Sequence, residues 1–216
     1  MALFTVKQVH YKNIVSYDDI EIAKRGVTFI CGESGCGKST LLKLLNGVIS
    51  PTSGHISYAG KALTDHDPIA LRREVLLVSQ SAYLFDRTVK ENFDEYYSYR
   101  DLDAISAAAA EKYLDICCVN LPLSSMCNVL SGGEKQRVFL AVNLALPSKV
   151  VMLDEPTSAL DDTNAHALMR NIITFCKEEE KTLLVVSHDT ALAQGYADTV
   201  IRLPGGARGT GGAGNE

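Results

Sequence analysis

GESGCGKST, residues 32–40, decides the fold of this chain. The continuous apolar run VTFIC (27–31) precedes it, as expected of a strand that is covered on both faces. The run STLLKLLNG (39–47) overlaps its end and has the apolar spacing of a helix. A glycine-rich turn between a buried strand and a helix lets successive backbone N–H groups surround an anion. The stretch therefore predicts an α/β fold and, within it, a phosphate-binding loop.

The residue types in this loop suit phosphate chemistry. Gly32, Gly37, Lys38 and Ser39 match the pattern G-x-x-x-x-G-K-[ST]. Lys38 brings a mobile positive charge to the β- and γ-phosphates, and Ser39 offers a hydroxyl to Mg²⁺. Thr40 is expected near the α-phosphate. The predicted nucleotide-binding loop consists of Gly32, Glu33, Ser34, Gly35, Cys36, Gly37, Lys38, Ser39 and Thr40.

Strands and helices alternate along the rest of the chain. Strands are expected at residues 3–9, 17–22, 27–31, 55–60, 74–80, 149–155, 182–188 and 199–203, and a helix at 163–180. This alternation implies a mostly parallel sheet whose ligands lie at the carboxyl ends of its strands. The first two strands alternate in polarity, which favours an N-terminal antiparallel β subdomain.

The expected domain spans residues 1–203. Residues from about 86 to 130 have helical composition and are expected to form a helical lobe inserted in the α/β core. The stretch PGGARGTGGAGNE (204–216) is rich in glycine, so a disordered tail is expected there.

The bulk composition argues against several classes of protein. No apolar run approaches the roughly 18 residues of a membrane span, and the N-terminus lacks the layout of a signal peptide, so a cytoplasmic location is expected. The net charge of −5 argues against a nucleic-acid partner, because nucleic-acid-binding proteins usually carry a basic face. The six cysteines show neither CxxC nor zinc spacing and are expected to be reduced, buried thiols, except for Cys36, which lies inside the phosphate loop and is expected in the nucleotide pocket.

Polar residues end three of the expected strands. The apolar strand in VVMLDE (150–155) delivers Asp154 to its carboxyl end, where a carboxylate can hold the hydration shell of Mg²⁺. Glu155 comes next and could accept a proton from an attacking water. Gln80 and His188 end two other strands, and they could contact Mg²⁺ or the water and the γ-phosphate, respectively.

LSGGEKQR (130–137) is a second glycine-rich element at a helix start. Ser131 and Glu134 have the S-x-x-E spacing of a capping box. The two glycines between them lose more conformational entropy on folding than other residues would, but they let an anion approach the positive end of a helix. One ATP should not need two helix N-termini from one chain. The simplest interpretation is that this element serves the ATP of a second copy, in a head-to-tail two-fold dimer.

These motifs resemble the nucleotide-binding subunit of an ATP-binding cassette (ABC) transporter. GESGCGKST, Gln80, LSGGEKQR, VVMLDEPTSALD and His188 occur in the order and spacing of that family, over essentially residues 3–203. Within the family the chain is most similar to small stand-alone bacterial cassettes of the iron-export type. The resemblance implies the ABC ATPase fold, in which a P-loop NTPase core carries the antiparallel β subdomain and the helical lobe.

The resemblance also implies roles for residues outside the phosphate loop. Ser131 and Gly133 would contact the γ-phosphate held by the partner, and Asp161 would cross the dimer interface to the partner's phosphate loop. An aromatic residue would stack on adenine; Tyr11 is the expected residue and Tyr17 the alternative. The segment SAYLFDRTVKENF, which follows Gln80, would sense a membrane-embedded partner.

The implied activity is ATP hydrolysis that powers transport through a separate integral membrane permease. The expected cofactors are ATP and Mg²⁺, and the expected partners are a second ABC ATPase subunit, in a homodimer, and the permease. The chain would be cytoplasmic and peripheral on the inner face of the cell membrane. The expected catalytic residues are Glu155, His188, Lys38 and Gln80, and the expected Mg²⁺ ligands are Ser39, Gln80 and Asp154.

Two alternatives to the transporter role fit the sequence less well. A soluble cassette ATPase without a permease, such as a DNA-repair cassette, would carry long coiled-coil insertions, and the sequence has no heptad stretch. A regulatory cassette that binds ATP without hydrolysing it would have lost its base or its switch residue, yet Glu155 and His188 are both present.

Overall fold

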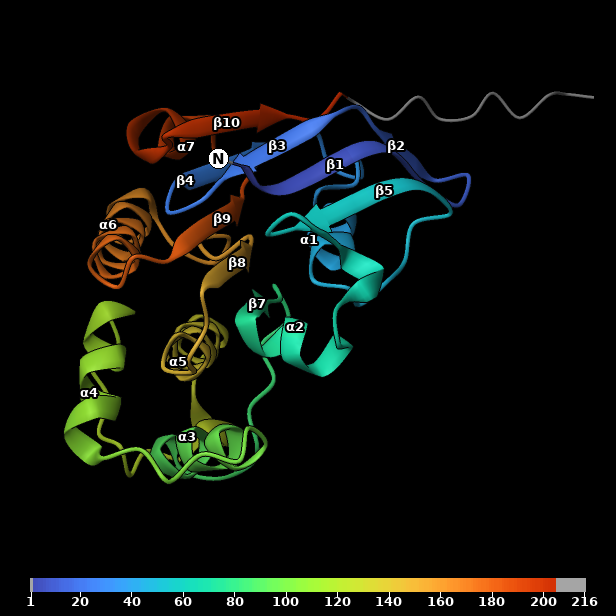
Figure 1. The fold of residues 1–216 in the computed structure, drawn as a ribbon. Coiled ribbons are helices and arrows are strands. Elements are labelled where there is room, and N and C mark those ends of the chain that lie inside the picture. Colours follow the sequence, from blue (N-terminus) through green and yellow to red (C-terminus); the bar gives the residue numbers. More distant parts are fainter. Residues whose placement is uncertain (1, 205–216) are drawn as a thin grey trace, which may run out of the picture.

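The structure is a computed structural model that describes residues 2–204 (Figure 1). It contains one antiparallel and one parallel β-sheet, with helices between them and below them in the view of Figure 1. The mostly parallel α/β core and the N-terminal antiparallel subdomain predicted from the sequence are both present. The disorder predicted for 204–216 falls outside the described residues, except for Pro204.

The parallel sheet has the strand order β10-β4-β9-β8-β7. Its strands are β4 (Val27–Cys31), β7 (Val75–Val78), β8 (Val150–Asp154), β9 (Thr182–Val186) and β10 (Thr199–Arg202). β4 and β9 are buried along their whole length, which explains their continuous apolar runs. β4, β9, β8 and β7 are adjacent and parallel, so their carboxyl ends lie together at one edge of the sheet.

The antiparallel sheet is built around β1, which pairs with β2, β3 and β5, while β5 also pairs with β6. Its strands are β1 (Ala2–Tyr11), β2 (Val15–Tyr17), β3 (Ile20–Ala23), β5 (Ser53–Tyr58) and β6 (Lys61–Ala62). Buried and exposed residues alternate in β3, so one face of the sheet covers the core.

Helix α1 (Lys38–Leu45) fills the space between the two sheets. Leu41, Leu42, Leu44 and Leu45 are fully buried and belong to the same hydrophobic cluster as side chains from both sheets. Full burial of one leucine side chain is worth about 1.5–3 kcal/mol. This packing fixes the start of α1, and therefore the loop at 32–40, against both sheets.

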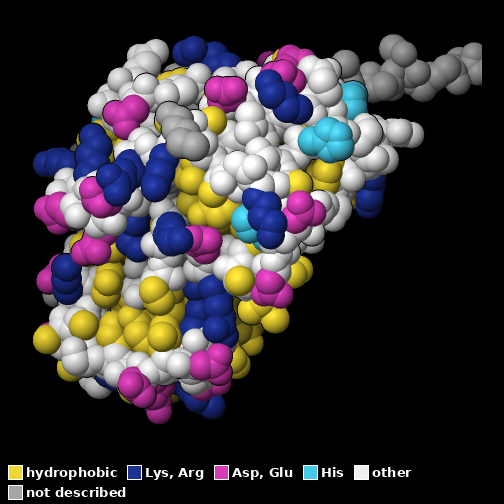
Figure 2. Space-filling view, viewed as in Figure 1, with side chains coloured by type: hydrophobic (Ala, Val, Ile, Leu, Met, Phe, Trp, Pro, Cys, Tyr) yellow, Lys and Arg dark blue, Asp and Glu magenta, His cyan; other side chains and the backbone are white. Residues whose placement is uncertain are grey.

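Most of the other helices contribute buried side chains to a second hydrophobic cluster, whereas Leu71, from the helix at 68–74, belongs to the same cluster as α1. The other helices are α2 (Pro68–Glu74), α3 (Val89–Ser98), α4 (Ala107–Ile116), α5 (Gly132–Leu144), α6 (Asp162–Glu178) and α7 (Thr190–Tyr196), with single 3₁₀ turns η1 (Leu63–Asp65) and η2 (Cys127–Val129). The helical lobe expected at about 86–130 corresponds to α3, α4 and η2. Figure 2 shows hydrophobic side chains gathered over this lower, helical part of the visible face, while charged side chains of both signs mix above it.

Two short helices were not expected from the sequence. In α2, Asp67 accepts hydrogen bonds from two backbone N–H groups of the first turn, and Pro68 takes the first helical position. In α7, Asp189 caps the helix start in the same way. Each helix has only seven residues, too few for a helical period to be recognisable.

Candidate functional site

The predicted motifs meet at the carboxyl edge of the parallel sheet. The loop 32–40 follows β4, Glu155 follows β8, and His188 and Gln80 come just after β9 and β7. A cavity of about 480 Å³ lies between these strand ends and strand β2 of the antiparallel sheet. It is lined by Ile14, Val15, Ser34, Gly35, Gly37, Lys38, Ser39, Thr40, Gln80, Glu155, Ser158 and His188.

The turn into α1 requires glycine at position 37. Gly37 has a φ of +100°, which L side chains rarely adopt. The Tyr17 hydroxyl donates a 2.7 Å hydrogen bond to the Gly37 carbonyl. A Cβ at position 37 would lie 2.8 Å from this hydroxyl and 2.8 Å from a methyl group of Val15. Strand β2 therefore packs directly against the loop through Tyr17 and Val15.

The Lys38 side chain lies inside the curl of the loop. Its ammonium group donates hydrogen bonds of 2.9 Å to the Gly32 carbonyl and 2.9 Å to the Glu33 carbonyl. The side chain is mostly buried, yet Lys38 lines the cavity together with Gly35 and Gly37. The cation is thus held where phosphates would enter.

Ser39 and Asp154 come together across the sheet. The Ser39 hydroxyl donates a 2.9 Å hydrogen bond to Asp154 Oδ1. Ser39 belongs to α1 and Asp154 ends β8, so the fold joins two motifs that are far apart in the sequence. A hydroxyl, a carboxylate and the nearby Gln80 amide are oxygen donors of the kind that Mg²⁺ prefers, so this donor set fits the ion.

Glu155 and His188 form a second pair beside the first. His188 Nδ1 lies 2.9 Å from Glu155 Oε2, and the exposed fractions of the side chains are 71% for His188 and 15% for Glu155. Glu155 has a φ of +53°, and its N–H donates a 3.0 Å hydrogen bond to the Val186 carbonyl. Gln136 Nε2 donates a 3.3 Å bond to the Glu155 carbonyl. The Glu155 backbone is therefore held by β9 and by the Gln136 side chain of α5, and the carboxylate has the His188 imidazole as its partner.

The two tyrosines considered for adenine lie differently. Tyr17 is buried beneath the loop, and burial raises the pKa of its hydroxyl far above the ordinary value, so the group is a neutral hydrogen-bond donor. Tyr11 lies opposite Val15 in the β1–β2 pair, and the Lys12 ammonium stands 5.2 Å from the centre of its ring. Among residues 2–204, Tyr11 is not in the cavity lining, whereas Ile14 and Val15 are.

Cys36 lies outside the cavity lining, although it belongs to the loop at 32–40. Cys36 is buried in the hydrophobic cluster around α1, and a Cβ at Gly32 would come within 2.7 Å of its sulfur. Its side chain therefore belongs to the core and not to the cavity, unlike the sequence-based expectation. All six cysteines lie in the described residues and are free thiols, with Cys118 the one that is partly exposed. Ser158, which the sequence analysis did not select, lines the cavity.

The capping box predicted for LSGGEKQR is confirmed. Glu134 Oε2 accepts bonds from the Ser131 N–H at 2.9 Å and the Ser131 hydroxyl at 2.6 Å, and the Glu134 N–H donates to Ser131 Oγ at 3.3 Å. These bonds from Ser131 lower the pKa of the Glu134 carboxyl. Ser131 and Gly133 stand at the start of α5 and do not appear in the cavity lining drawn from residues 2–204.

Asp161 begins another helix. It accepts a 3.0 Å bond from the Asn164 N–H and a 2.6 Å bond from Asn164 Nδ2, and these hydrogen bonds lower the pKa of its carboxyl. Its place is the start of α6, shortly after Ser158 of the cavity wall. The structure thus leaves Ser131, Gly133 and Asp161 outside the protomer's own cavity.

No helix within residues 2–204 is both long and apolar enough to cross a bilayer.

Known proteins resemble this chain in sequence and in fold. The ABC transporter family pattern matches residues 16–158. The chain is 37% identical over 174 residues to the probable iron export ATP-binding protein FetA of Escherichia coli K12, covering 81% of this chain and 77% of that protein. It is 36% identical over 203 residues to the hemin import ATP-binding protein HmuV of Vibrio vulnificus YJ016, covering 89% and 76% of the two chains.

A solved structure agrees with these relatives. The dimeric, post-hydrolysis state of the ATP-binding cassette MJ0796, bound to ADP and Pi, superposes with a TM-score of 0.80 at 27% identity, covering 93% of this chain and 94% of that one. The family match extends over the cavity-lining loop, Gln80, the start of α5 and Glu155. The chain therefore belongs to the ABC transporter family and is one of its ATP-binding, ATP-hydrolysing subunits.

Proposed function

We propose that this chain binds ATP with Mg²⁺, hydrolyses it in a head-to-tail homodimer, and uses that cycle to drive a separate membrane permease. One observation carries the proposal. A single cavity is lined by the buried Lys38, by Ser39, whose hydroxyl donates to Asp154 just outside the lining, and by the Glu155–His188 pair. A charge for phosphates, oxygen donors for a metal ion and a base with an imidazole partner are the components of phosphoryl transfer to water.

The phosphates are held by the loop and by Lys38. The N–H groups of the loop converge on the β-phosphate, and the ammonium moves from the Gly32 and Glu33 carbonyls to the phosphate oxygens. Ser39, Asp154 and Gln80 would hold Mg²⁺, which offsets negative charge on the β- and γ-phosphates when bound. The adenine side of the cavity is apolar at Ile14 and Val15, with Tyr11 behind them as the aromatic candidate.

Glu155 acts as the base. Its carboxylate takes a proton from water while the water oxygen bonds to the γ-phosphorus and the bond from that phosphorus to the ADP oxygen breaks. His188 Nδ1 faces the Glu155 carboxylate, which can only accept, so Nδ1 is the nitrogen that donates to it. Nε2 is left to face the transferring group, and it donates to an oxygen of that group when the imidazole carries both protons. The carbonyl contact from Gln136 and the backbone bond to β9 hold Glu155 in place during this step.

The glycines at the start of α5 support a second copy as the partner. A Cβ on Gly132 would meet no other heavy atom of residues 2–204 within 4 Å, its chain neighbours and own helix backbone aside. On Gly133 the nearest atom would be Arg137 Nη1, at 3.5 Å. The protomer's own packing thus requires neither glycine, although glycine costs about 0.5–1 kcal/mol in a helix relative to alanine. We infer that they let Ser131 and the helix N-terminus reach the γ-phosphate held by a second copy.

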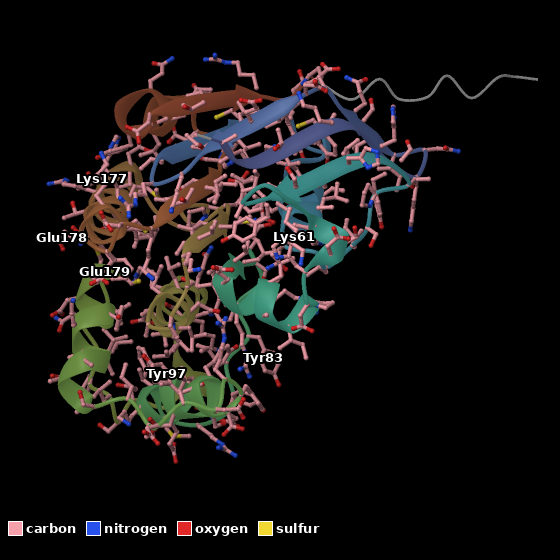
Figure 3. All side chains as sticks on the ribbon, in the orientation of Figure 1. Lys61, Tyr83, Tyr97, Lys177, Glu178 and Glu179 are labelled. Carbon is pink, nitrogen blue, oxygen red and sulfur yellow. The ribbon has the colours of Figure 1, made fainter. Side chains whose placement is uncertain are left out.

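The permease would dock near the segment that follows Gln80. A groove of about 350 Å³ is lined there by Ala82, Tyr83, Leu84, Phe85, Asp86, Cys127, Asn128 and Lys135. Tyr83 is 62% exposed and lies on the segment that leads from β7 to α3 (Figure 3). The centroids of the Tyr83 and Phe85 rings lie 5.2 Å apart, with the rings edge-to-face. The two rings form an apolar surface beside the charged residues Asp86 and Lys135. In this arrangement the chain is cytoplasmic and peripheral on the inner face of the membrane.

The proposal is tested by measuring ATP hydrolysis as a function of protein concentration. Since each site is completed by the partner's Ser131 and Gly133, the rate per chain should rise with concentration until the dimer saturates. A rate per chain that stays constant while light scattering shows a monomer would refute the shared site. Copurification of an integral membrane permease from native membranes, weakened by Tyr83→Glu, tests the transport role against a soluble cassette ATPase.

A further inference from the structure

Asn92, in the first turns of α3, is a buried polar residue with an unusual set of partners. Its exposed fraction is 0%. Asn92 Oδ1 accepts a 2.7 Å bond from the Phe85 N–H. The two hydrogens of Nδ2 are shared among three acceptors, the Phe85 carbonyl at 3.1 Å, the Thr88 carbonyl at 2.9 Å and Cys127 Sγ at 3.3 Å. The amide thus joins the segment before α3 to η2, which is far away in the sequence.

These two segments lead to different parts of the catalytic apparatus. Phe85 lies between Gln80, which lines the protomer's own cavity, and α3. Cys127 lies in η2, directly before Ser131 and the start of α5. In the proposed dimer, Gln80 serves the ATP of its own protomer and Ser131 serves the ATP of the other. Asn92 therefore stands between residues that belong to two different ATP sites.

A short backbone ladder already ties the two segments together. The Val89 N–H donates to the Ser125 carbonyl at 2.9 Å, and the Cys127 N–H donates to the Arg87 carbonyl at 2.9 Å. Such a ladder in a loop is exposed to slippage, because its register is set by few bonds. The Asn92 amide adds side-chain bonds that fix the register from the buried side.

An aromatic contact extends the same connection to α5. The ring centroids of Phe85 and Tyr96 lie 6.1 Å apart, and those of Tyr96 and Phe139 lie 6.2 Å apart. Phe139 belongs to α5, and Tyr96 also donates a 2.7 Å hydrogen bond to the Tyr83 carbonyl. Edge-on aromatic pairs are favourable beyond their burial, so Tyr96 of α3 links the segment after Gln80 to the helix that begins after Ser131.

We propose that Asn92 is a positioning residue that couples the two ATP sites of the dimer, because it makes the Gln80 segment and the Ser131 segment move as one unit. The inference rests on the proposed function, in which these segments serve different nucleotides. Binding of a nucleotide to one protomer moves or orders its Gln80 segment. Through Asn92, the same event orders Ser131 and the start of α5 for the other protomer's nucleotide.

Three variants test the connection. Cys127→Ala removes the sulfur acceptor and leaves the Asn92 bonds to Phe85 and Thr88 in place, so it is the variant most certain to fold. Cys127→Ser restores an acceptor at the same position and should rescue the connection. Asn92→Leu removes all of the amide's bonds. Asn143→Leu is the matched control, because Asn143 is also a buried amide but donates within α5, to the Phe139 carbonyl at 2.8 Å.

The readout is amide hydrogen exchange, with and without Mg²⁺ and the analogue AMP-PNP, at a concentration where light scattering shows a monomer. In the wild type the analogue should slow exchange at residues 32–40, at 80–87 and also at 126–134. In Cys127→Ala and Asn92→Leu the first two regions should stay protected, and the protection at 126–134 should fall by about fivefold, the effect of one buried hydrogen bond. Cys127→Ser and Asn143→Leu should keep it.

The outcomes separate this inference from the proposed function. Protection at 32–40 and 80–87 without protection at 126–134 in the wild type would overturn the coupling and leave the nucleotide site intact. Equal protection at 126–134 in the wild type, Cys127→Ala and Asn92→Leu would overturn the role of Asn92. A loss in Asn143→Leu as large as in Asn92→Leu would show a general effect of stability and would also overturn it. No protection at 32–40 in the wild type would refute the nucleotide site, and this inference with it.

Discussion

Replacement of Gly133 by alanine should stabilise the isolated chain and at the same time inactivate the enzyme. Gly133 is helical, and the nearest atom to an added Cβ is the end of the flexible Arg137 side chain, at 3.5 Å. The substitution removes conformational freedom from the unfolded chain without a clash, so the free energy of unfolding should rise by about 0.5 kcal/mol, within the range for Gly→Ala in a helix. For a chain of this length that corresponds to a Tm increase of about 1–2 °C.

The same methyl group should block the approach of the partner's γ-phosphate to the α5 backbone. A lost hydrogen bond to a charged group costs about 1.5–3 kcal/mol. If that bond is made in the transition state, kcat should fall by about 10- to 100-fold. The assays are thermal unfolding without nucleotide and steady-state hydrolysis at a protein concentration that saturates the dimer.

Gly195→Ala is the matched control. Gly195 lies in α7, and a Cβ there would meet no other heavy atom of the described chain within 4 Å. It should give a similar rise in Tm with unchanged hydrolysis. The reasoning is refuted if Gly133→Ala hydrolyses ATP at the wild-type rate, and its packing part is refuted if Gly133→Ala unfolds at a lower temperature than the wild type.

Other substitutions test the remaining parts of the site. Glu155→Gln should retain ATP binding, lose at least about 100-fold in turnover and trap an ATP-bound dimer, as seen by size-exclusion chromatography; near-normal hydrolysis would exclude Glu155 as the base. Lys38→Ala should weaken nucleotide binding in a calorimetric titration, and unaltered affinity would contradict the phosphate-loop assignment. Cys36 should react slowly with a maleimide with and without ATP, because its thiol is buried in the core; fast labelling that ATP blocks would place it in the cavity. Hydrogen bonds from Ser131 lower the folded-state pKa of Glu134, so they stabilise the fold at pH values above the ordinary carboxyl pKa, and this stabilisation is lost as the pH falls through the folded-state pKa. The difference in unfolding free energy between wild type and Glu134→Gln should therefore shrink in acid. A difference that does not change with pH would contradict this.

The strand ends could be predicted because their sequence signal is local. Continuous apolar runs mark buried parallel strands, and a polar residue follows at or just after the end of each run. Asp154 ends β8 and accepts the bond from Ser39, and His188, two residues after β9, lines the cavity. The Ser39–Asp154 bond follows from the strand order, since β4, β9 and β8 are neighbours. The capping box at Ser131 was likewise visible in four consecutive residues.

The wall of the cavity and the interior of the loop could not be predicted in the same way. Side chains alternate along β2, so Val15 and Tyr17 share the face toward Gly37, and a tyrosine that looks available for adenine is used to support the loop. Which thiol points into the core depends on the turn geometry, and Cys36 turns inward against Gly32. The bonds of Asn92 depend on the packing of η2 on α3, which a single sequence does not encode locally.

The two carbonyl contacts of Lys38 give the loop a threshold for its ligands. Its ammonium already donates to Gly32 and Glu33, so an arriving anion competes with bonds that the loop makes to itself. Hydrogen bonds from a charged donor are worth about 1.5–3 kcal/mol each, and a small ion with one charged oxygen recovers little more than it displaces. A polyphosphate offers several oxygens to the cation and the loop together. Only such a ligand makes hydrogen bonds that outweigh the two carbonyl bonds that Lys38 gives up. The resting contacts of one lysine thereby act as a filter that favours chains of phosphate over single anions.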